Sequence, residues 1–214
     1  MKKIFISTLL VAGAMSAQAE GYVGASLGRG KLPFDCAPDA TCKQSVNVFK
    51  IYAGTRLKEA SQYRLGPVQV DTLEAGYVRT GSKAIETRTV EQGYIIIDPI
   101  NGNTVTTRMV PQVRQVSLDA LVFTPVLHMP LSKEFDVFVK PGAALITATI
   151  KTTLNGVSQK SESELKLKPY VSFGASYAVT PGIRVFGSSD WFPYSVEGVH
   201  GVSRALNLGA EVSF

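Results

Sequence analysis

The sequence ends with Val202-Ser-Arg-Ala-Leu-Asn-Leu-Gly-Ala-Glu-Val-Ser-Phe214, a stretch that alternates with a period of two. Apolar side chains occupy positions 206, 208, 210, 212 and 214, and small or polar ones lie between them. This alternation is typical of a β-strand whose two faces meet different environments. Arg204 interrupts the apolar face near the start of the strand. The stretch therefore predicts a strand that keeps one apolar face as far as its last residue.

Seven upstream segments show the same alternation. They are residues 20–29, 46–56, 68–79, 116–124, 135–149, 166–177 and 183–191. With the last segment they make eight strands, an even number, as bacterial single-chain barrels have. In the segment 116–124 the apolar residues fall at even positions, so Ser117 and Asp119 are predicted to lie on the polar face.

The glycines indicate which face lies inside. Six of them fall on the polar faces: Gly24, Gly54, Gly76, Gly142, Gly174 and Gly209. Glycine weakens a strand unless space is tight, and the interior of an eight-stranded barrel is only just wide enough for side chains. Small and polar residues inside, with apolar residues outside, match a barrel that faces lipid. No later apolar run is long enough for a spanning helix. The predicted fold is therefore all-β, an eight-stranded antiparallel up-and-down transmembrane β-barrel.

The N-terminus has the layout of a signal peptide. Lys2 and Lys3 precede an apolar run at residues 4–14, and Ala17-Gln-Ala19 supplies small residues for cleavage. We expect residues 1–19 to be removed, which leaves one barrel domain at 20–214 and lowers the net charge from +5 to +3. The alternative is a retained anchor, although no stop-transfer pattern follows. The small, scattered charge does not favour nucleic acid as a partner.

The two cysteines, Cys36 and Cys42, lie in the first long link with five residues between them. Export would place them in an oxidising compartment, so we expect a disulfide. The chain-entropy model gives so small a loop about 2 kcal/mol. The alternative, a metal-binding pair, lacks the two further ligands that a zinc site needs.

The links between the predicted strands alternate in length. Those at 57–66, 127–134 and 177–182 are short to moderate, and those at 30–45, 80–115, 150–165 and 192–201 are long. Such barrels have short periplasmic turns and longer extracellular loops. The longest link carries its own hairpin signal, because 94–97 and 105–110 flank a turn rich in Pro, Asn and Gly. A mobile loop is the alternative there.

Five stretches carry a family resemblance. They are Gly21-Tyr-Val-Gly-Ala-Ser-Leu-Gly28, Phe49-Lys-Ile-Tyr-Ala-Gly54, Leu73-Glu-Ala-Gly-Tyr77, Phe138-Val-Lys-Pro-Gly-Ala143 and Tyr177-Ala-Val-Thr-Pro-Gly-Ile-Arg184. In order and spacing they resemble the outer-membrane protein A-like eight-stranded β-barrels, over nearly all of residues 20–214. The resemblance implies that Phe214 is a signal read by the outer-membrane assembly machinery.

The sequence also departs from this family. Ser176 and Ser188 stand where acidic residues are usual, and Phe186 stands where a basic residue is common. A salt bridge between those two strands is therefore not expected. The soluble peptidoglycan-binding domain of some relatives is not expected either.

Nine charged residues point inward in the predicted register: Lys50, Arg56, Glu74, Asp119, Asp136, Lys140, Arg184, Asp190 and Glu211. A buried charge must be paired, because moving an unpaired charge out of water costs much free energy. Since eight strands leave little open lumen, we expect a structural salt-bridge plug. The alternative is a gate on a narrow ion path.

No catalytic, metal or cofactor site is predicted. A hydrolase needs a histidine within reach of a serine or an aspartate. His128 is expected in a short turn, and His200 and Ser203 would face opposite sides of a strand. No P-loop, metal cluster or dinucleotide fingerprint is found in the sequence.

The predicted function is a non-enzymatic, structural or surface-interaction barrel of the Gram-negative-type outer membrane, which supports envelope integrity or adhesion. The expected partners are outer-membrane lipids and lipopolysaccharide, the assembly machinery, and a host or surface ligand at the loops. A small pore, an outer-membrane lipid-modifying enzyme and a soluble lipocalin-like carrier are the alternatives.

Overall fold

The computed structural model describes residues 21–56, 64–65, 68–81, 83–98, 102–196 and 199–214. The predicted signal peptide, residues 1–19, lies outside these ranges, as does most of the predicted turn 57–66. In the part of the chain that is described, no helix is long and apolar enough to cross a membrane.

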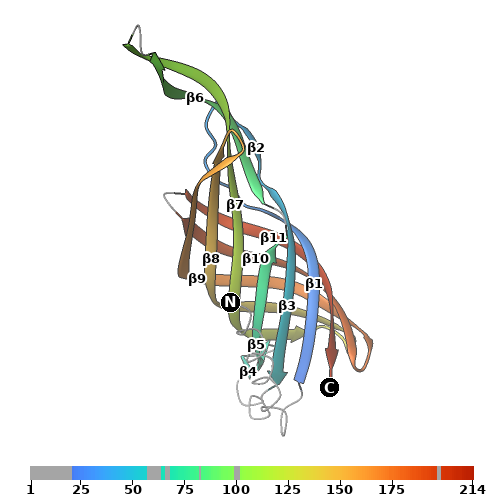
Figure 1. Cartoon of the computed structure of the whole chain (residues 1–214). Helices are drawn as coiled ribbons and strands as arrows, with labels where there is room; N and C mark the ends of the chain where they lie inside the picture. Colours follow the sequence, from blue (N-terminus) through green and yellow to red (C-terminus); the bar gives the residue numbers. More distant parts are fainter. Residues whose placement is uncertain (1–20, 57–63, 66–67, 82, 99–101, 197–198) are drawn as a thin grey trace.

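Eight antiparallel strands close into a barrel (Figure 1). Their bounds are β1 Gly21–Lys31, β3 Ser45–Arg56, β5 Val68–Thr80, β7 Gly102–Pro130, β8 Phe135–Leu154, β9 Val157–Thr180, β10 Ile183–Val196 and β11 Val199–Ser213. Each pairs with the next in this order, and β11 pairs with β1 to close the ring. The predicted eight-stranded barrel is therefore confirmed.

Three further strands lie outside this ring: β2 Thr41–Lys43, β4 Arg64–Leu65 and β6 Ala84–Asp98. Strand β4 pairs with the start of β5. Strand β6 pairs with the part of β7 that extends beyond the barrel, and β2 pairs with β6. Strands β2, β6 and β7 thus build a sheet on one end of the barrel.

Strand β11 shows how the sequence alternation maps onto the barrel wall. Leu206 and Leu208 are 71% and 75% exposed, whereas Asn207 between them is 3% exposed. The other ring strands also expose large apolar side chains: Val23, Leu27, Ile51, Leu73, Phe123, Val139, Phe173 and Val185. So extensive an apolar outer surface is typical of contact with lipid. The predicted inversion of faces is confirmed for β11.

Four interior aromatic rings lie over glycines of the neighbouring strand. The register pairs Tyr22 with Gly54, Tyr52 with Gly24, Phe138 with Gly174, and Phe186 with Gly209. A Cβ atom on any of these glycines would overlap the facing ring. The ring centroids of Tyr52 and Phe186 are 5.7 Å apart in an edge-to-face arrangement. The inward-facing glycines therefore make room for an aromatic cluster, as in other curved sheets.

Gly209→Ala tests this packing. We expect the free energy of unfolding to fall by about 1–3 kcal/mol, because the new methyl group meets the Phe186 ring and the Ala25 carbonyl. Urea unfolding in lipid vesicles measures the change. Gly93→Ala in β6 is the matched control, since nothing lies within 4 Å of the Cβ atom it would add. Equal effects of the two substitutions would contradict the packing role of Gly209.

The interior at the end nearer β6 is apolar. The buried side chains there include Leu32, Phe34, Val46, Val48, Val78, Val116, Leu118, Val122, Ile146, Ile150 and Phe192. They come from most of the ring strands and from the link between β1 and β3. This end of the barrel is thus filled by an apolar core rather than by polar side chains.

The predicted inward position of Asp119 is wrong. Leu118 and Ala120 are 2% exposed and face inward, whereas the Asp119 side chain is 38% exposed. Its Oδ1 atom accepts a hydrogen bond from the Tyr77 hydroxyl at 2.6 Å and lies 3.6 Å from Arg79 Nε. The reason is that the inward face of β7 contacts the apolar core at this level, whereas its outward face lies at the edge of the apolar belt. At this level the inward side chains are therefore apolar and the outward Asp119 is polar, the reverse of the predicted pattern.

Two of the predicted long loops are largely strand. Strand β8 ends only at Leu154, and β9 already begins at Val157. Asn155 and Gly156 join them, with φ values of 48° and 79°. Positive φ at both central positions is required by a two-residue type I′ turn. Strands β10 and β11 also extend into the link predicted at 192–201. The loop prediction for 150–165 is therefore wrong.

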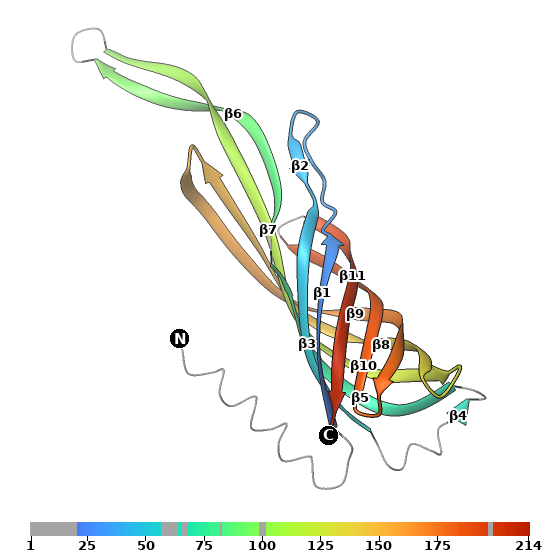
Figure 2. The same ribbon diagram turned by 90° about the vertical axis from the view of Figure 1, so that its right-hand side faces the viewer.

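The hairpin predicted within 80–115 is confirmed and is longer than expected. Strand β6 pairs with β7 from Ala84 opposite Val116 to Asp98 opposite Gly102. Figure 2 shows the β6–β7 and β8–β9 hairpins projecting beyond the β10–β11 hairpin, at the end of the barrel opposite the C-terminus. We assign this projecting end to the outside, because barrels of this kind have their short turns in the periplasm.

Cys36 and Cys42 form the predicted disulfide in the link between β1 and β3. Both cysteines pack against the apolar core. Gln44 Nε2 donates a hydrogen bond to the Phe34 carbonyl oxygen at 3.0 Å, within the same link. The first residues of this link, Leu32 and Phe34, therefore fill the outer end of the barrel interior, and β2 joins the projecting sheet.

Candidate functional site

Two lysines pair with buried carboxylates in the barrel interior. Lys140 Nζ lies 2.6 Å from Glu74 Oε2, and Lys50 Nζ lies 3.5 Å from Asp190 Oδ2. Each of the four side chains is at most 7% exposed. They come from β8, β5, β3 and β10, so each pair joins two strands that are not neighbours in the ring. The structure thus brings four of the predicted inward charges together as ion pairs.

Tyrosines extend this network. The Tyr22 hydroxyl donates a hydrogen bond to Glu74 Oε2 at 3.2 Å, and the Tyr52 hydroxyl donates one to Glu211 Oε2 at 3.1 Å. The Lys140 ammonium also lies 4.7 Å from the centroid of the Tyr52 ring. Sequence reasoning missed both tyrosines, because a period of two gives the face of a residue but not the carboxylate it meets across the barrel.

Arg184 lies between two carboxylates at the periplasmic end. Its guanidinium is 3.8 Å from Glu211 Oε1 and 3.9 Å from Asp136 Oδ2. The same Asp136 oxygen is 2.6 Å from His128 Nδ1. Arg56 is the last residue of β3 and is exposed. Arg56 was predicted to point inward, and the structure places it at the mouth of the barrel.

The histidine–carboxylate pair of His128 and Asp136 was not predicted. His128 lies within β7 and not in the predicted turn, and the β7–β8 hairpin brings it beside Asp136. The closeness of both residues to a short predicted link was the signal that could have indicated this pair. Among the described residues, no hydroxyl or thiol group forms a hydrogen bond with His128. The pair therefore resembles a structural contact of the Arg184 cluster more than a nucleophile-activating one.

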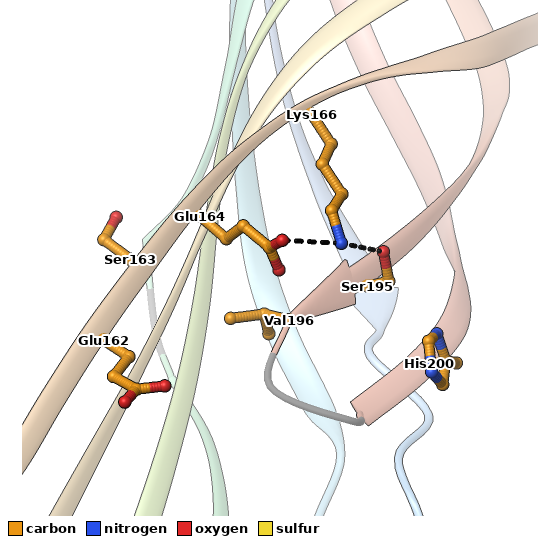
Figure 3. Close-up of a pocket in the computed structure, with 7 residues that line it drawn as sticks. All are labelled: Glu162, Ser163, Glu164, Lys166, Ser195, Val196 and His200. Carbon is orange, nitrogen blue, oxygen red and sulfur yellow. Dashed lines mark hydrogen bonds and ion pairs between the residues drawn. The ribbon is translucent and has the colours of Figure 1, made fainter.

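A cleft of about 460 Å³ opens at the outer rim (Figure 3). It lies beside the outer part of β9, because β9 pairs with β10 only as far as Val171 opposite Trp191. The lining residues are Glu162, Ser163, Glu164, Lys166, Ser195, Val196 and His200. Lys166 Nζ lies 2.7 Å from Glu164 Oε1 and donates a hydrogen bond to Ser195 Oγ at 3.2 Å.

The cleft offers carboxylate, ammonium, hydroxyl and imidazole groups to a polar ligand. No group of metal-binding side chains is found among the described residues. His200 is exposed and Ser203 is buried, on opposite sides of β11 as expected. Sequence reasoning missed this cleft, because it exists only where β9 and β10 separate.

Solved structures of two outer-membrane barrels are similar to this chain. One is Ail, the attachment invasion locus protein of Yersinia pestis, in complex with the heparin analogue sucrose octasulfate. It has a TM-score of 0.53 and 11% identity, and the match covers 92% of this chain and 99% of Ail. The other is Neisserial surface protein A, with a TM-score of 0.51, 14% identity, and coverage of 91% and 97%. At these identities the similarity concerns the fold.

Sequence comparison supports the same assignment. No curated protein sequence matches the chain significantly. A family model described as the OmpA-like transmembrane domain matches residues 16–191, which is most of the chain. With its closed ring of eight strands and its apolar outer belt, the protein belongs to the family of OmpA-like transmembrane domains and is an outer-membrane β-barrel protein.

Proposed function

We propose that this protein is a non-enzymatic surface-interaction barrel, in which a filled barrel anchors a projecting β-sheet that binds ligands outside the cell. The observation that carries the proposal is the projection of the β6–β7 and β8–β9 hairpins beyond the β10–β11 hairpin (Figure 2). Because β7, β8 and β9 each run as one strand from the barrel wall into these hairpins, they hold the sheet in a fixed direction.

The projecting β6–β7 hairpin carries exposed basic side chains. Arg88 and Arg108 are exposed on β6 and β7, and Arg114 is paired with Glu86 at 3.3 Å nearer the barrel. Guanidinium groups bind sulfate and phosphate well. This chemistry, together with the heparin analogue held by the structurally similar Ail, supports an acidic polysaccharide as the ligand class.

Trimming the hairpin tests the proposal. Replacing residues 87–113 by Asn-Gly removes both exposed arginines and joins Glu86 to Arg114, which are paired across the hairpin, through a two-residue turn. We expect binding of the protein in nanodiscs to immobilised heparin to fall at least about tenfold, since charge contacts to a polyanion add up. Heat-dependent migration on a detergent gel checks that the barrel is still folded. Unchanged heparin binding by the trimmed barrel would contradict the proposal.

The buried ion pairs of the interior support a plug rather than a gate. Lys140 is paired with Glu74, and Lys50 is paired with Asp190. The outer half of the interior is apolar. An ion passing through would lose its hydration without finding free counter-charges. A conductance near the baseline in planar lipid bilayers would agree with a plug, and discrete open channels would favour the pore alternative.

Phe214 is proposed as the assembly signal, as the family resemblance implies. Its side chain is 73% exposed, and its backbone N–H donates a hydrogen bond to the Gly21 carbonyl oxygen at 2.9 Å. The ring is therefore accessible to another protein. We expect deletion of Phe214 to slow assembly in cells while refolding into lipid vesicles stays near the wild-type rate. An equal slowing in both settings would indicate a role in folding instead.

A further inference from the structure

Three cations lie side by side on the lipid-facing surface of β1 and β11. Arg29 and Lys31 are two residues apart on the outward face of β1, and Lys31 is directly opposite Arg204 on β11. All three residues are exposed. Side chains directly opposite on antiparallel strands have Cβ atoms about 5 Å apart, and like charges in such positions are destabilising. The fold therefore concentrates positive charge in one place.

Among the described residues, no carboxylate is paired with this charge. In the described part of the chain, none of the three cations takes part in an ion pair, and their cross-strand neighbours Asn47, Ser45 and Leu206 are uncharged. Arg79, on the outward face of β5, differs in this respect, because Asp119 lies 3.6 Å from it. The outward Arg79 is thus paired within the protein, whereas the cations of the cluster are not.

The cluster lies where the apolar belt ends. On β11 the belt runs from Phe214 to Leu206, through exposed apolar residues. This length is roughly 27 Å along the strand, or about 20 Å along the membrane normal at the usual tilt, close to the thickness of such a belt. Arg204 is the next outward residue, so the cations reach the level of the outer lipid headgroups.

Trp191 stands beside the cluster. It is opposite Arg204 on β10, and the guanidinium carbon of Arg204 lies 4.8 Å from the centroid of its ring. Its indole N–H donates a hydrogen bond to Ser189 Oγ at 2.7 Å. The ring thus holds Arg204 against the barrel wall at the interface, where tryptophan is commonly found. This stacking reduces the side-chain freedom that Arg204 would lose on binding an anion.

We propose that Arg29, Lys31 and Arg204 form a binding site for the anionic phosphate group of an outer-leaflet lipid headgroup. Guanidinium and ammonium groups are the usual partners of phosphate, and Arg204 can present two parallel N–H donors. The adjoining Leu27 and Leu206, which are 69% and 71% exposed, lie where the acyl chains of the same lipid would begin. The site therefore fits a molecule that has both a phosphate and apolar chains.

The chain contains a single tryptophan, Trp191, which makes the site directly observable. The full protein is refolded in vesicles that contain brominated phosphatidic acid or brominated phosphatidylcholine, each mixed with the same unlabelled phosphatidylcholine. Bromine quenches a nearby tryptophan. We expect quenching to show a preference of about tenfold for phosphatidic acid, because each cation near an anionic lipid strengthens binding several-fold. In Arg29→Gln/Lys31→Gln, which leaves Arg204 on Trp191, this preference should disappear.

Arg79→Gln is the matched control, and it should keep the preference because it removes an outward arginine that is already paired with Asp119 and lies outside the cluster. Equal quenching by the two brominated lipids would overturn the proposal, as would an unchanged preference in the double variant. Millimolar inorganic phosphate added to the wild-type vesicles should not abolish the preference. If it does, the site binds a soluble anion rather than a lipid headgroup, and the proposal fails.

Discussion

Lys140→Met is expected to lower the free energy of unfolding by about 3–5 kcal/mol, because it leaves Glu74 as an uncompensated buried charge. The Glu74 side chain is 4% exposed, and its two polar contacts are with Lys140 at 2.6 Å and with the Tyr22 hydroxyl at 3.2 Å. One neutral hydroxyl cannot replace the ammonium. Urea unfolding of the protein in lipid vesicles measures the loss.

Two further variants identify the cause. In Lys140→Met combined with Glu74→Gln no buried charge is left, so much of the lost stability should return. Lys166→Met removes an ion pair of similar length, 2.7 Å to Glu164, but those side chains are 39% and 42% exposed. Its effect should stay below about 1 kcal/mol. If the double variant is no more stable than Lys140→Met alone, the loss comes from packing around Lys140 and not from the unpaired carboxylate.

Leu208→Arg is expected to cost about 2–4 kcal/mol when the protein folds into lipid vesicles, because it places a charge against the middle of the bilayer. Leu208 is 75% exposed and lies within the outward apolar face of β11, one outward position from its midpoint at Ala210. Its side chain makes little contact with the barrel, so the effect arises from the lipid. Folding in detergent micelles should be affected less.

Val202→Arg is the matched control on the same strand and the same face. Val202 is 40% exposed and lies beyond Arg204, outside the proposed belt. A charge near the interface costs only about 0–1 kcal/mol, so this variant should fold almost as well as the wild type. Equal losses for both substitutions would show that the position of the membrane boundary on β11 is wrong.

The sequence by itself determined the fold class, the number of ring strands and the faces of β11. Lipid imposes the same requirement on every outward side chain, which is that it be apolar. This requirement acts on each residue separately, so it leaves a period of two that can be read locally. The inward glycines followed the same logic, since Gly54 and Gly209 lie under the rings of Tyr22 and Phe186. The disulfide of Cys36 and Cys42 was predictable because the sequence has no other cysteine.

Only the tertiary structure decided which groups meet. Lys140 and Glu74 are 66 residues apart in sequence, and their contact depends on the registers of β7 with β5 and with β8. Whether the Asp119 side chain faces inward or outward depended on the level at which β7 leaves the apolar belt. That level is set by the whole ring of strands. The cleft beside β9 and the cation cluster of β1 and β11 arise in the same way. Pairing between distant strands and the depth of each residue in the membrane are set by closure of the barrel, and a local pattern carries neither.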